Sequence, residues 1–363
     1  MASVIVGMSG GVDSSITAYI LREQGYDVEG ISFILYEARM KQTFTGCCSI
    51  EAIKDASNTA SALGISHSSI DLREEFMEKV IEPFISAYCH GVTPNPCIMC
   101  NRHIKFPYLL KIADEKGADF IATGHYARVE SSQGSRVNSQ GYLLKKGLDS
   151  KKDQSYVLYV LKKEELKRLL LPLGDKKKNG VREIARTLNL PAAKRPESQE
   201  ICFVEDNDYC RFMEGLSANT CGEIVEAETG IILGRHNGIH LYTIGQRKRL
   251  GIATGKPLYV TKIDPKTKIV YVGDKNLAMA RRFFVEDINW LSEKESRFTA
   301  SVKIRSTMQA EPANIVIKGE NSAEITFNEP QWAPAPGQSA VFYKNDTVIG
   351  GGIITGHGQN NCY

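Results

Sequence analysis

A short apolar strand that breaks into glycines and small hydroxyl residues constrains this sequence more than any other feature. Val4–Val6 is typical of a buried strand, and apolar residues at helical spacing follow at Ile16, Tyr19 and Ile20. The turn between them reads GMSGGVDSS. Backbone N–H groups and the helix dipole favour an anion at a helix N-terminus, and glycines let the backbone approach that anion closely. We therefore predict a phosphate-binding loop at this junction.

The loop differs from two common nucleotide-binding loops and resembles a third. No Lys follows the glycines, as GxxxxGK(S/T) requires, and the spacing is not GxGxxG. The stretch SGGVDS resembles the pyrophosphate loop (PP-loop) of the ATP pyrophosphatases, which cleave ATP between the α and β phosphates. In that family the Asp helps to hold Mg²⁺. The resemblance therefore implies a metal role for Asp13 and an ATP-binding role for Gly7, Met8, Ser9, Gly10, Gly11, Val12, Asp13 and Ser14. The alternative is a glycine-rich turn with an Asp or Ser cap.

Strands and helices alternate through the first third of the chain. The stretches 28–35, 68–71 and 120–123 predict strands, and the helical patterns between them predict parallel βαβ units in a doubly wound α/β sheet. Ligands of such sheets bind beyond the carboxyl ends of the strands, where the PP-loop and Gly124 would both emerge. A further helical pattern covers 156–170.

The second half of the chain has a different pattern of predicted elements. Short strands and many glycines between 222 and 275 predict a small domain, and short alternating runs from 283 onward predict an all-β barrel or sandwich. We therefore expect three domains, in keeping with the chain length. They are a PP-loop catalytic domain at 1–205, a small central α+β domain at 206–278 and a C-terminal β-barrel at 279–363.

Composition limits the cellular compartment and the kinds of partner that we expect for the chain. No apolar run approaches the ~20 residues of a membrane helix, and the sequence does not begin with an export signal, so we expect a cytoplasmic protein with no membrane partner. The chain has nine cysteines, and in a reducing compartment we expect them to take part in chemical reactions rather than to form a scaffold of disulfides. The net charge of +3 means that any nucleic acid must find a local basic surface.

Basic residues between 145 and 178 form either such an RNA-facing patch or a solvated helix face. They are Lys145, Lys146, Lys151, Lys152, Lys162, Lys163, Lys167, Arg168, Lys176, Lys177 and Lys178.

The second informative stretch is the loop that contains Cys97 and Cys100. Two prolines, Pro94 and Pro96, argue against regular structure before the cysteines and stiffen the backbone. A CxxC pair serves zinc, Fe–S clusters and redox thiols. The sequence has no second CxxC, which disfavours a closed structural zinc site. Cys202 lies far along the sequence in another irregular stretch.

Seven stretches carry a specific resemblance. They are GMSGGVDSS at 7–15, TPNPCIMCN at 93–101, ATGHYAR at 122–128, KDQSYVLY at 152–159, ICFV at 201–204, TIGQRKRLGI at 243–252 and PGQSAVFY at 336–343. Together, in this order and with similar spacings, they resemble the bacterial tRNA-specific 2-thiouridylase family over residues 4 to 355. Members of that family replace O2 of the wobble uridine of certain tRNAs with sulfur.

The resemblance implies an ATP-dependent tRNA-uridine 2-sulfurtransferase. ATP would adenylate the C2 oxygen of the wobble uridine in the anticodon stem-loop, and pyrophosphate and then AMP would leave. Sulfur would be carried as a persulfide on Cys202, supplied by a cysteine desulfurase or a sulfur-relay protein. Cys100 would be the nucleophile that attacks the persulfide, releases sulfur toward C2 and forms a transient disulfide with Cys202.

The resemblance also assigns further contacts, residue by residue. Gly124 matches the adenine-pocket glycine, and Phe33 matches an apolar residue that contacts ATP. Asn95, Pro96 and Cys97 match the segment that contacts the flipped-out target base. The positions that match tRNA contacts are His125, Lys152, Asp153, Gln154, Arg305, Ser306 and Gln338.

Some of these matches leave alternatives open. His125 could be a satisfied structural histidine, and Ser306 stands where an aromatic residue can follow the Arg. Cys97 stands where some members have an Asp that acts as general acid/base, and a thiol has a reference pKa of about 8.5 against about 3.9 for Asp. We therefore predict that Cys97 supports the site rather than carries sulfur. Cys97, Cys100 and Cys202 could instead hold an Fe–S cluster.

Two other functions would explain part of the sequence. An amide-forming ATP pyrophosphatase, such as an amidotransferase-type synthetase, would use the PP-loop but leave Cys100 and Cys202 without a role. A tRNA-binding protein without catalysis would use ATP only to order its fold. The presence of 2-thiouridine in tRNA after incubation with ATP, Mg²⁺ and a sulfide source separates these readings.

Overall fold

The computed structural model describes residues 1–36, 50–132, 141–194, 201–204, 208–213 and 221–356. The chain divides into two compact units. The first unit comprises Met1–Val80, Pro96–Asp208 and Asp346–Val348; the second comprises Ile81–Asn95, Tyr209–Asn345 and Ile349–Tyr363. Among the described residues, the helices are all too short or too polar to cross a membrane.

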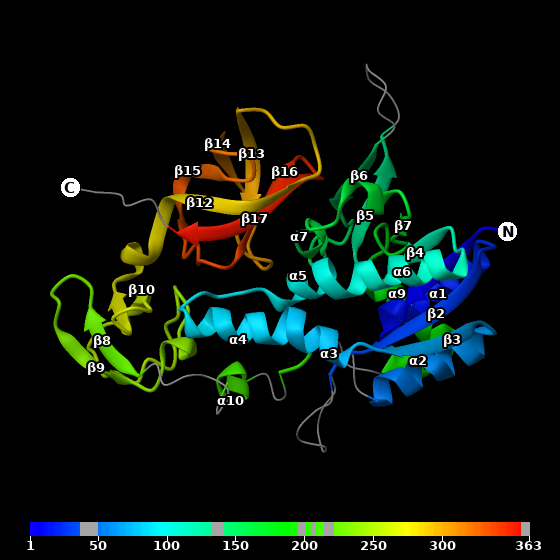
Figure 1. Ribbon diagram of the computed structural model, residues 1–363, viewed down its shortest axis with the longest axis horizontal. Helices are drawn as coiled ribbons and strands as arrows, with labels where there is room; N and C mark the ends of the chain where they lie inside the picture. Colours follow the sequence, from blue (N-terminus) through cyan, green and yellow to red (C-terminus); the bar gives the residue numbers. More distant parts are fainter. Residues whose placement is uncertain (37–49, 133–140, 195–200, 205–207, 214–220, 357–363) are drawn as a thin grey trace. The chain divides into compact units, whose positions relative to one another are not determined.

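A five-stranded parallel sheet forms the centre of the first unit (Figure 1). Its strands, in spatial order, are β3 (Ser66–Asp71), β2 (Asp27–Ile34), β1 (Ser3–Gly7), β4 (Phe120–Ala122) and β7 (Leu169–Leu170). The chain moves outward from β1 to β2 and β3, then returns to the other side of β1 at β4. The point where this order reverses lies between β1 and β4, which is where open α/β sheets bind their ligands.

Helices cover both faces of this sheet. Val4 and Val6 of β1 pack in one cluster with Ile16 and Val181, which lie on α1 (Val12–Glu23) and α9 (Lys178–Thr187). On the opposite face, Leu109 lies directly against Gly7. The remaining helices of this layer arrangement are α2 (Ile50–Leu63), on the α1 face, and α6 (Phe106–Lys116), which carries Leu109. The doubly wound α/β fold expected from the sequence is confirmed.

A run of helices links β3 to β4. It comprises α3 (Arg73–Phe76), a π-helical segment at Met77–Ile81, α4 (Glu82–Cys89), α5 (Pro96–Cys100), a second π-helical segment at Asn101–Lys105, and α6. Helix α5 and the second π-helical segment carry the CxxC pair and the residues that follow it directly. π-Helical turns are uncommon and often occur at functional sites.

The region 156–170 differs from the single helix that its pattern predicts. It forms α7 (Ser155–Leu158), α8 (Lys163–Leu166) and the short strand β7. Leu169 and Leu170 pair with Ile121 and Ala122 of β4. Backbone pairing at the sheet edge therefore outweighs the local helical pattern in this segment.

The second unit holds two β structures, which confirms the expected change to short strands in the second half of the chain. The smaller sheet has the order β10-β11-β8-β9, and its core includes Ile224, Val260 and Val270. Its strands are β8 (Gly222–Glu226), β9 (Ile232–His236), β10 (Tyr259–Asp264) and β11 (Ile269–Gly273), and the short helix α10 (Tyr209–Met213) precedes them.

The larger β structure is an antiparallel barrel that follows the order β12-β15-β14-β13-β16-β17 and closes through pairing of β17 with β12. Phe283, Ile315, Phe327 and Phe342 fill its core. Its strands are β12 (Met279–Trp290), β13 (Arg297–Lys303), β14 (Glu311–Ile317), β15 (Ala323–Trp332), β16 (Ser339–Lys344) and β17 (Thr347–Gly356). The expected C-terminal barrel is confirmed, while the exact domain limits 1–205, 206–278 and 279–363 stay a prediction.

The PP-loop takes its shape from one glycine in the left-handed region. Gly10 has φ +71°, and a Cβ at this position would overlap the carbonyl oxygen of Ala52. Gly11 has an ordinary φ of −86°, and the nearest atom to an added Cβ is the hydroxyl oxygen of Ser9 at 3.6 Å. The two adjacent glycines are therefore not equivalent.

We expect Gly10→Ala to destabilise the protein by more than about 1–2 kcal/mol, the usual cost of a left-handed non-glycine residue, because a steric overlap adds to the strain. Gly11→Ala is the matched control and should change stability by less than about 1 kcal/mol. Urea unfolding of both variants and the wild type measures the difference. Equal destabilisation by the two substitutions would contradict this description of the loop.

Candidate functional site

Side-chain hydroxyls hold the PP-loop closed on itself. The hydroxyls of Ser14 and Ser15 both donate to the carbonyl oxygen of Gly11, at 3.1 Å and 2.9 Å. The backbone N–H of Ser9 donates to the Ser14 hydroxyl at 3.1 Å. Ser14 and Ser15 are buried, whereas Ser9 is exposed. In this structure, Ser14 and Ser15 therefore shape the loop, and Ser9 is the hydroxyl that is accessible to a ligand.

Gly124 lies against this loop from the end of β4. A Cβ at Gly124 would come within 2.9 Å of the carbonyl carbon of Asp13 and the amide nitrogen of Ser14. The residue must therefore be a glycine for the segment after β4 to approach the first turn of α1 this closely. This places the predicted adenine-pocket residue beside the predicted phosphate loop, at the point where the strand order reverses.

Asp13 is the centre of a three-residue polar cluster. Its carboxylate accepts a hydrogen bond from the hydroxyl of Tyr126 at 2.8 Å. The ammonium of Lys178 donates to both carboxylate oxygens of Asp13, at 2.7 Å and 2.6 Å. Lys178 is 8% exposed and Tyr126 is 3% exposed, while the Asp13 side chain is 34% exposed. Two buried groups thus hold one accessible carboxylate.

Two members of this cluster were not predicted as site residues. Tyr126 stands inside the ATGHYAR stretch, where only Gly124 and His125 received a role. Lys178 was grouped with the basic surface residues, and that grouping is wrong for Lys178 because its neighbours Lys176 and Lys177 are exposed while it is buried. A Lys at the first position of a helix gives no sign in the sequence of which carboxylate it will meet.

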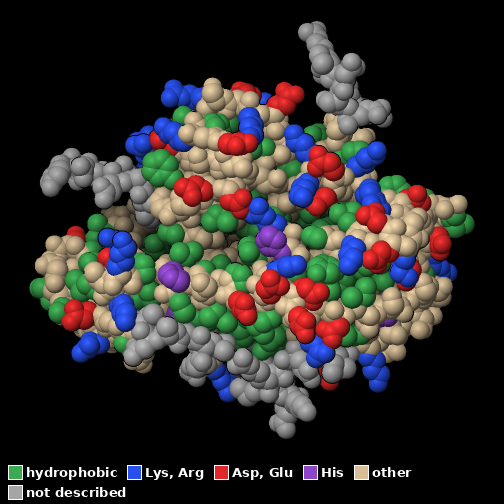
Figure 2. All heavy atoms as spheres, in the orientation of Figure 1, with side chains coloured by type: hydrophobic (Ala, Val, Ile, Leu, Met, Phe, Trp, Pro, Cys, Tyr) green, Lys and Arg blue, Asp and Glu red, His purple; other side chains and the backbone are tan. Residues whose placement is uncertain are grey.

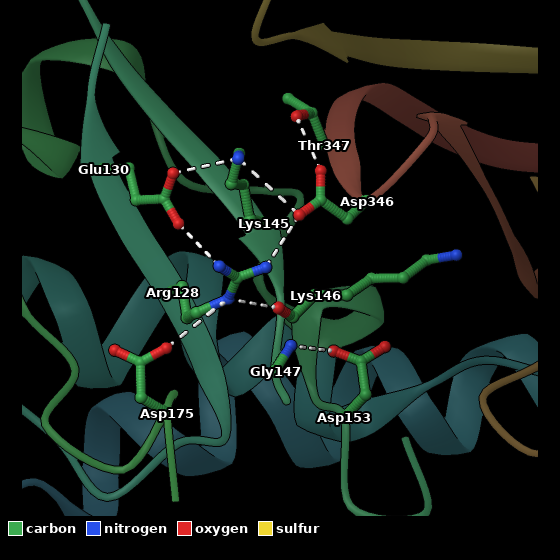
Figure 3. A network of polar contacts seen from close by, with 9 residues as sticks. All are labelled: Arg128, Glu130, Lys145, Lys146, Gly147, Asp153, Asp175, Asp346 and Thr347. Carbon is green, nitrogen blue, oxygen red and sulfur yellow. Dashed lines mark hydrogen bonds and ion pairs between the residues drawn. The ribbon is translucent and has the colours of Figure 1, made fainter. Parts of the chain in front are cut away.

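A second polar network fixes the strand that directly follows Tyr126. Arg128, in β5 (Ala127–Ser131), pairs with Glu130 at 2.6 Å, with Asp346 at 2.7 Å and with Asp175 at 3.8 Å (Figure 3). Its Nε also donates to the carbonyl oxygen of Lys146, in β6 (Tyr142–Lys146), at 3.0 Å. The Arg128 side chain is 22% exposed, while the side chains of Glu130, Asp346 and Asp175 are 41%, 42% and 76% exposed, so water screens the pair with Asp175 most. Asp175 belongs to the segment that leads into α9, so the network ties that segment to β5.

The two predicted sulfur-chemistry cysteines lie in the first unit, together with the PP-loop. Cys100 is buried at the end of α5, and Cys202 is half-buried. The amide of Asn101 donates to the carbonyl oxygen of Val157 at 2.9 Å and so fixes the turn that follows Cys100. Beside Cys202, the Phe203 ring packs edge-on against Phe76, with ring centroids 5.7 Å apart.

The donor set does not fit a metal cluster in this conformation. Cys97 is exposed whereas Cys100 is buried. Among the described residues, no three His, Cys, Asp or Glu side chains converge. Cys97, Cys100 and Cys202 all belong to the described residues, so they do not form the three-cysteine arrangement that an Fe–S cluster needs.

Comparison with known proteins identifies the family. Three family models match in order along the chain. They are the tRNA methyl transferase HUP domain at residues 2–206, the tRNA methyl transferase PRC-barrel domain at 211–274 and the aminomethyltransferase beta-barrel domain at 280–354. The tRNA-specific 2-thiouridylase MnmA of Carboxydothermus hydrogenoformans is 46% identical over 358 residues, which are 97% of either chain. The protein of the same name from Clostridioides difficile is 45% identical over 355 residues, again 97% of either chain.

The chain belongs to the tRNA-specific 2-thiouridylase family, whose members are tRNA sulfurtransferases. The resemblance drawn from the seven motifs is therefore confirmed.

Several residues that the 2-thiouridylase resemblance assigns to tRNA make hydrogen bonds within the protein. In the second unit, the amide of Gln338 donates to the carbonyl oxygen of Thr93 at 2.9 Å. Arg305 donates to the carbonyl oxygens of Ile244 and Ala333, each at 3.0 Å. These bonds position the backbone, and contact of either side chain with tRNA stays a prediction. Ser306 is exposed.

Asp153 and Gln154 behave in the same way in the first unit. The Asp153 carboxylate accepts the backbone N–H groups of Gly147 and Ser155, at 3.0 Å and 3.1 Å. The side-chain oxygen of Gln154 accepts the N–H of Tyr126 at 2.9 Å, so Gln154 holds a residue of the Asp13 cluster. Lys152 is half-buried. A role of these three residues in tRNA binding also stays a prediction.

The charge distribution gives no simple guide to an RNA surface. On the face in Figure 2, basic and acidic side chains of the described residues are interspersed rather than gathered into a broad field of one sign. This agrees with the small net charge of +3. A 2-thiouridylase of this composition would have to bind RNA through local contacts.

The remaining predicted contacts lie on several elements. Phe33, on β2, is half-buried and packs edge-on against Tyr108 with ring centroids 6.5 Å apart. Asn95 is half-buried and Pro96 is buried, and the boundary between the two units falls between them. Asn95 therefore belongs to the second unit and Pro96 and Cys97 to the first, and contact of these residues with the target base stays a prediction.

His125 has the environment of a structural histidine. It is 9% exposed, its Nδ1 lies 2.8 Å from the Thr123 hydroxyl, and its ring stacks on Phe106. Burial, with a smaller contribution from the charge of Lys105, holds the pKa of His125 well below its ordinary value. The imidazole is therefore neutral in the folded protein, and any contact with tRNA would not use a positive charge.

This burial predicts how stability depends on pH. Below the ordinary His pKa of about 6.5, the unfolded chain takes up a proton at His125 that the folded protein does not. Stability contributed by His125 should therefore fall as pH drops through 6.5, with a slope that approaches about 1.4 kcal/mol per pH unit. Urea unfolding between pH 7.5 and 5.5 should show a steeper decline for the wild type than for His125→Gln.

Part of the pH dependence should remain in this variant. Burial also lowers the pKa of His67, His236 and His240. Parallel stability curves for wild type and His125→Gln would show that His125 is protonated in the folded state, contrary to its burial here.

Proposed function

We propose that this protein is a tRNA-uridine 2-sulfurtransferase that acts on the wobble uridine, position 34. ATP adenylates the C2 oxygen of the base, pyrophosphate leaves, and sulfur from a cysteine persulfide then replaces the oxygen as AMP departs. The observation that carries this proposal is the accessible Asp13 carboxylate in a closed PP-loop, in the same unit as Cys100 and Cys202. Identity of 46% to a tRNA-specific 2-thiouridylase over 97% of both chains supports it.

Adenylation answers a chemical difficulty. The C2 carbonyl of uracil is a poor electrophile because oxide is a poor leaving group. Once its oxygen is bonded to the α-phosphorus of ATP, that oxygen can leave as part of AMP. The base must also leave the anticodon stack before either step, at a cost of a few kcal/mol that is smallest in a single-stranded loop.

The PP-loop would hold the pyrophosphate that leaves in the first step. Its backbone N–H groups precede α1, and the exposed Ser9 hydroxyl is available to a phosphate oxygen. Asp13 fits a role toward Mg²⁺, which commonly binds one or two carboxylates together with substrate phosphates. Bound there, Mg²⁺ would neutralise charge on the phosphates.

The sulfur step would use both cysteines. Cys202 would receive the outer sulfur of a donor persulfide and so become a persulfide itself. The Cys100 thiolate would then attack the Sγ atom of Cys202 and release the outer sulfur as hydrosulfide. Hydrosulfide would then add to C2 and expel AMP, leaving a Cys100–Cys202 disulfide that an external dithiol must reduce before the next cycle. This scheme requires the two Cα atoms to approach within about 4.4–6.8 Å in at least one state.

Nucleoside mass spectrometry tests the proposed function. Wild-type protein incubated with tRNA, ATP, Mg²⁺, a cysteine desulfurase with free cysteine as the persulfide donor, and a dithiol reductant should form 2-thiouridine at the wobble position, with one pyrophosphate released per modified base. Asp13→Ala should abolish pyrophosphate release because the metal and phosphate charge lose their anchor. Glu183→Gln, which changes an exposed carboxylate of α9, is the control and should behave as wild type.

The outcomes separate the three functions considered. Pyrophosphate release without 2-thiouridine would favour an amide-forming enzyme, and tRNA binding without either product would favour a binding protein. Pyrophosphate release by Asp13→Ala at the wild-type rate would refute the role of the loop.

The cysteines should separate by role in the same assay. We expect Cys100→Ser and Cys202→Ser each to reduce 2-thiouridine formation by more than about 10³-fold, as loss of a nucleophile does. Both variants should still release pyrophosphate in a single turnover, because adenylation precedes sulfur transfer. Cys97→Ser should lose only part of the activity, and Cys97→Asp should retain more than Cys97→Ala if this side chain moves a proton or contacts the base.

Two results would contradict these assignments. After turnover without reductant, peptide mapping should find a Cys100–Cys202 cross-link, and its absence would rule out the two-thiol scheme. Iron-loaded wild-type protein that loses both iron and activity in Cys97→Ser would favour a cluster in a conformation other than the one described.

A further inference from the structure

A buried lysine is directed at the PP-loop from a distant part of the chain. Lys178 is 8% exposed, although Lys side chains are almost never fully buried without a partner. Its ammonium lies 2.7 Å and 2.6 Å from the two carboxylate oxygens of Asp13, and 5.6 Å from the centre of the Tyr126 ring. Asp13 and Lys178 are 165 residues apart in the sequence.

The backbone around Lys178 is held in place independently of its side chain. Asp149 accepts the backbone N–H of Lys178 at 3.0 Å, at the first turn of α9. Val181 and Ala185 of the same helix are buried in the cluster that includes α1. Arg128 also lies 3.8 Å from Asp175, in the segment that precedes the helix (Figure 3). A rigid element therefore presents the ammonium to the loop.

The environment of Asp13, which pairs with Lys178, must change when ATP and Mg²⁺ bind. If Asp13 turns to Mg²⁺ as the proposed function requires, its carboxylate no longer neutralises Lys178 alone. The ammonium has three donors and remains buried. The anionic oxygens of the β- and γ-phosphates have the charge and the acceptor atoms to take the place of Asp13.

We propose that Lys178 is a phosphate ligand of this enzyme, which binds the pyrophosphate portion of ATP and stabilises the charge that develops on it as it leaves. The inference rests on the proposed function and names a residue for it. The PP-loop has no lysine after its glycines, and α9 supplies the missing cation from elsewhere in the chain. The Asp13–Lys178 pair is then the resting state of the site, and it exchanges partners when magnesium and ATP enter.

A purely structural ion pair is the alternative. In that case Lys178 would serve only to neutralise Asp13, and its replacement would harm the protein because a half-buried carboxylate loses its positive partner and keeps only the Tyr126 hydroxyl. Neutralising both residues would then restore what the single change removes. A phosphate ligand behaves differently, because removing Asp13 does not make its positive charge dispensable.

Binding of inorganic pyrophosphate with Mg²⁺, measured by calorimetry, is the first readout. We expect Lys178→Met to weaken this binding by about 10- to 100-fold, the effect of losing a charge-assisted hydrogen bond. Pyrophosphate release in the presence of tRNA and ATP should fall by about 10²–10³-fold. Lys177→Met is the matched control, since it removes an adjacent exposed lysine, and it should bind pyrophosphate as the wild type does.

A second pair of variants separates the two roles, because the double variant leaves neither member of the ion pair charged. The phosphate-ligand role predicts that Asp13→Asn/Lys178→Met binds pyrophosphate at least about tenfold more weakly than Asp13→Asn alone. Circular dichroism should show both variants folded. Equal or tighter binding by the double variant would overturn the inference and leave a structural ion pair.

Failure of this inference and failure of the proposed function give different results. Formation of 2-thiouridine by the wild type, with pyrophosphate binding unaffected in Lys178→Met, would refute the role of Lys178 alone. Lys178-dependent pyrophosphate binding without any thiolation of tRNA would preserve the phosphate site and refute the proposed substrate.

Discussion

The contact of Asp13 with Lys178 and Tyr126 joins three parts of the fold at one carboxylate. Asp13 lies in the first turn of α1, Tyr126 follows β4, and Lys178 begins α9, so the cluster forms only when the sheet order places these elements together. Gly124 allows the close approach, because any side chain there would meet the backbone of the loop. The geometry of the PP-loop thus depends on the whole parallel sheet rather than on its own short sequence.

The same unit contains the PP-loop and both cysteines of the proposed sulfur transfer. Cys100 ends the short helix α5, and Asn101 ties the turn that follows it to Val157. Cys202 adjoins the buried Phe203. Rigid attachment beside each thiol is compatible with movement of the thiols themselves, which sulfur transfer requires. In the second unit, contacts such as Gln338 to Thr93 anchor the start of the CxxC loop.

Sequence reasoning succeeded where a feature is local and failed where it is not. The SGGVDS turn after an apolar strand predicted the loop at Gly10, and alternating elements predicted the parallel sheet. The Asp13–Lys178 pair was missed because two residues 165 positions apart give no joint signal, and a surface lysine is the usual case. The strand Leu169–Leu170 was read as helix because its pairing with β4 is a tertiary effect. RNA contacts such as Gln338 came only from family resemblance, and the structure shows these groups engaged within the protein.

The most direct test of the chemistry follows one oxygen atom. A tRNA transcript made with [2-¹⁸O]uridine would be incubated with the protein, ATP, Mg²⁺ and a sulfur donor, and the AMP produced would be analysed by mass spectrometry. Adenylation of the C2 oxygen through the PP-loop at Asp13 predicts one ¹⁸O atom in AMP for each 2-thiouridine formed. Formation of 2-thiouridine with unlabelled AMP, or with ADP and phosphate as the products, would contradict adenylation of the base.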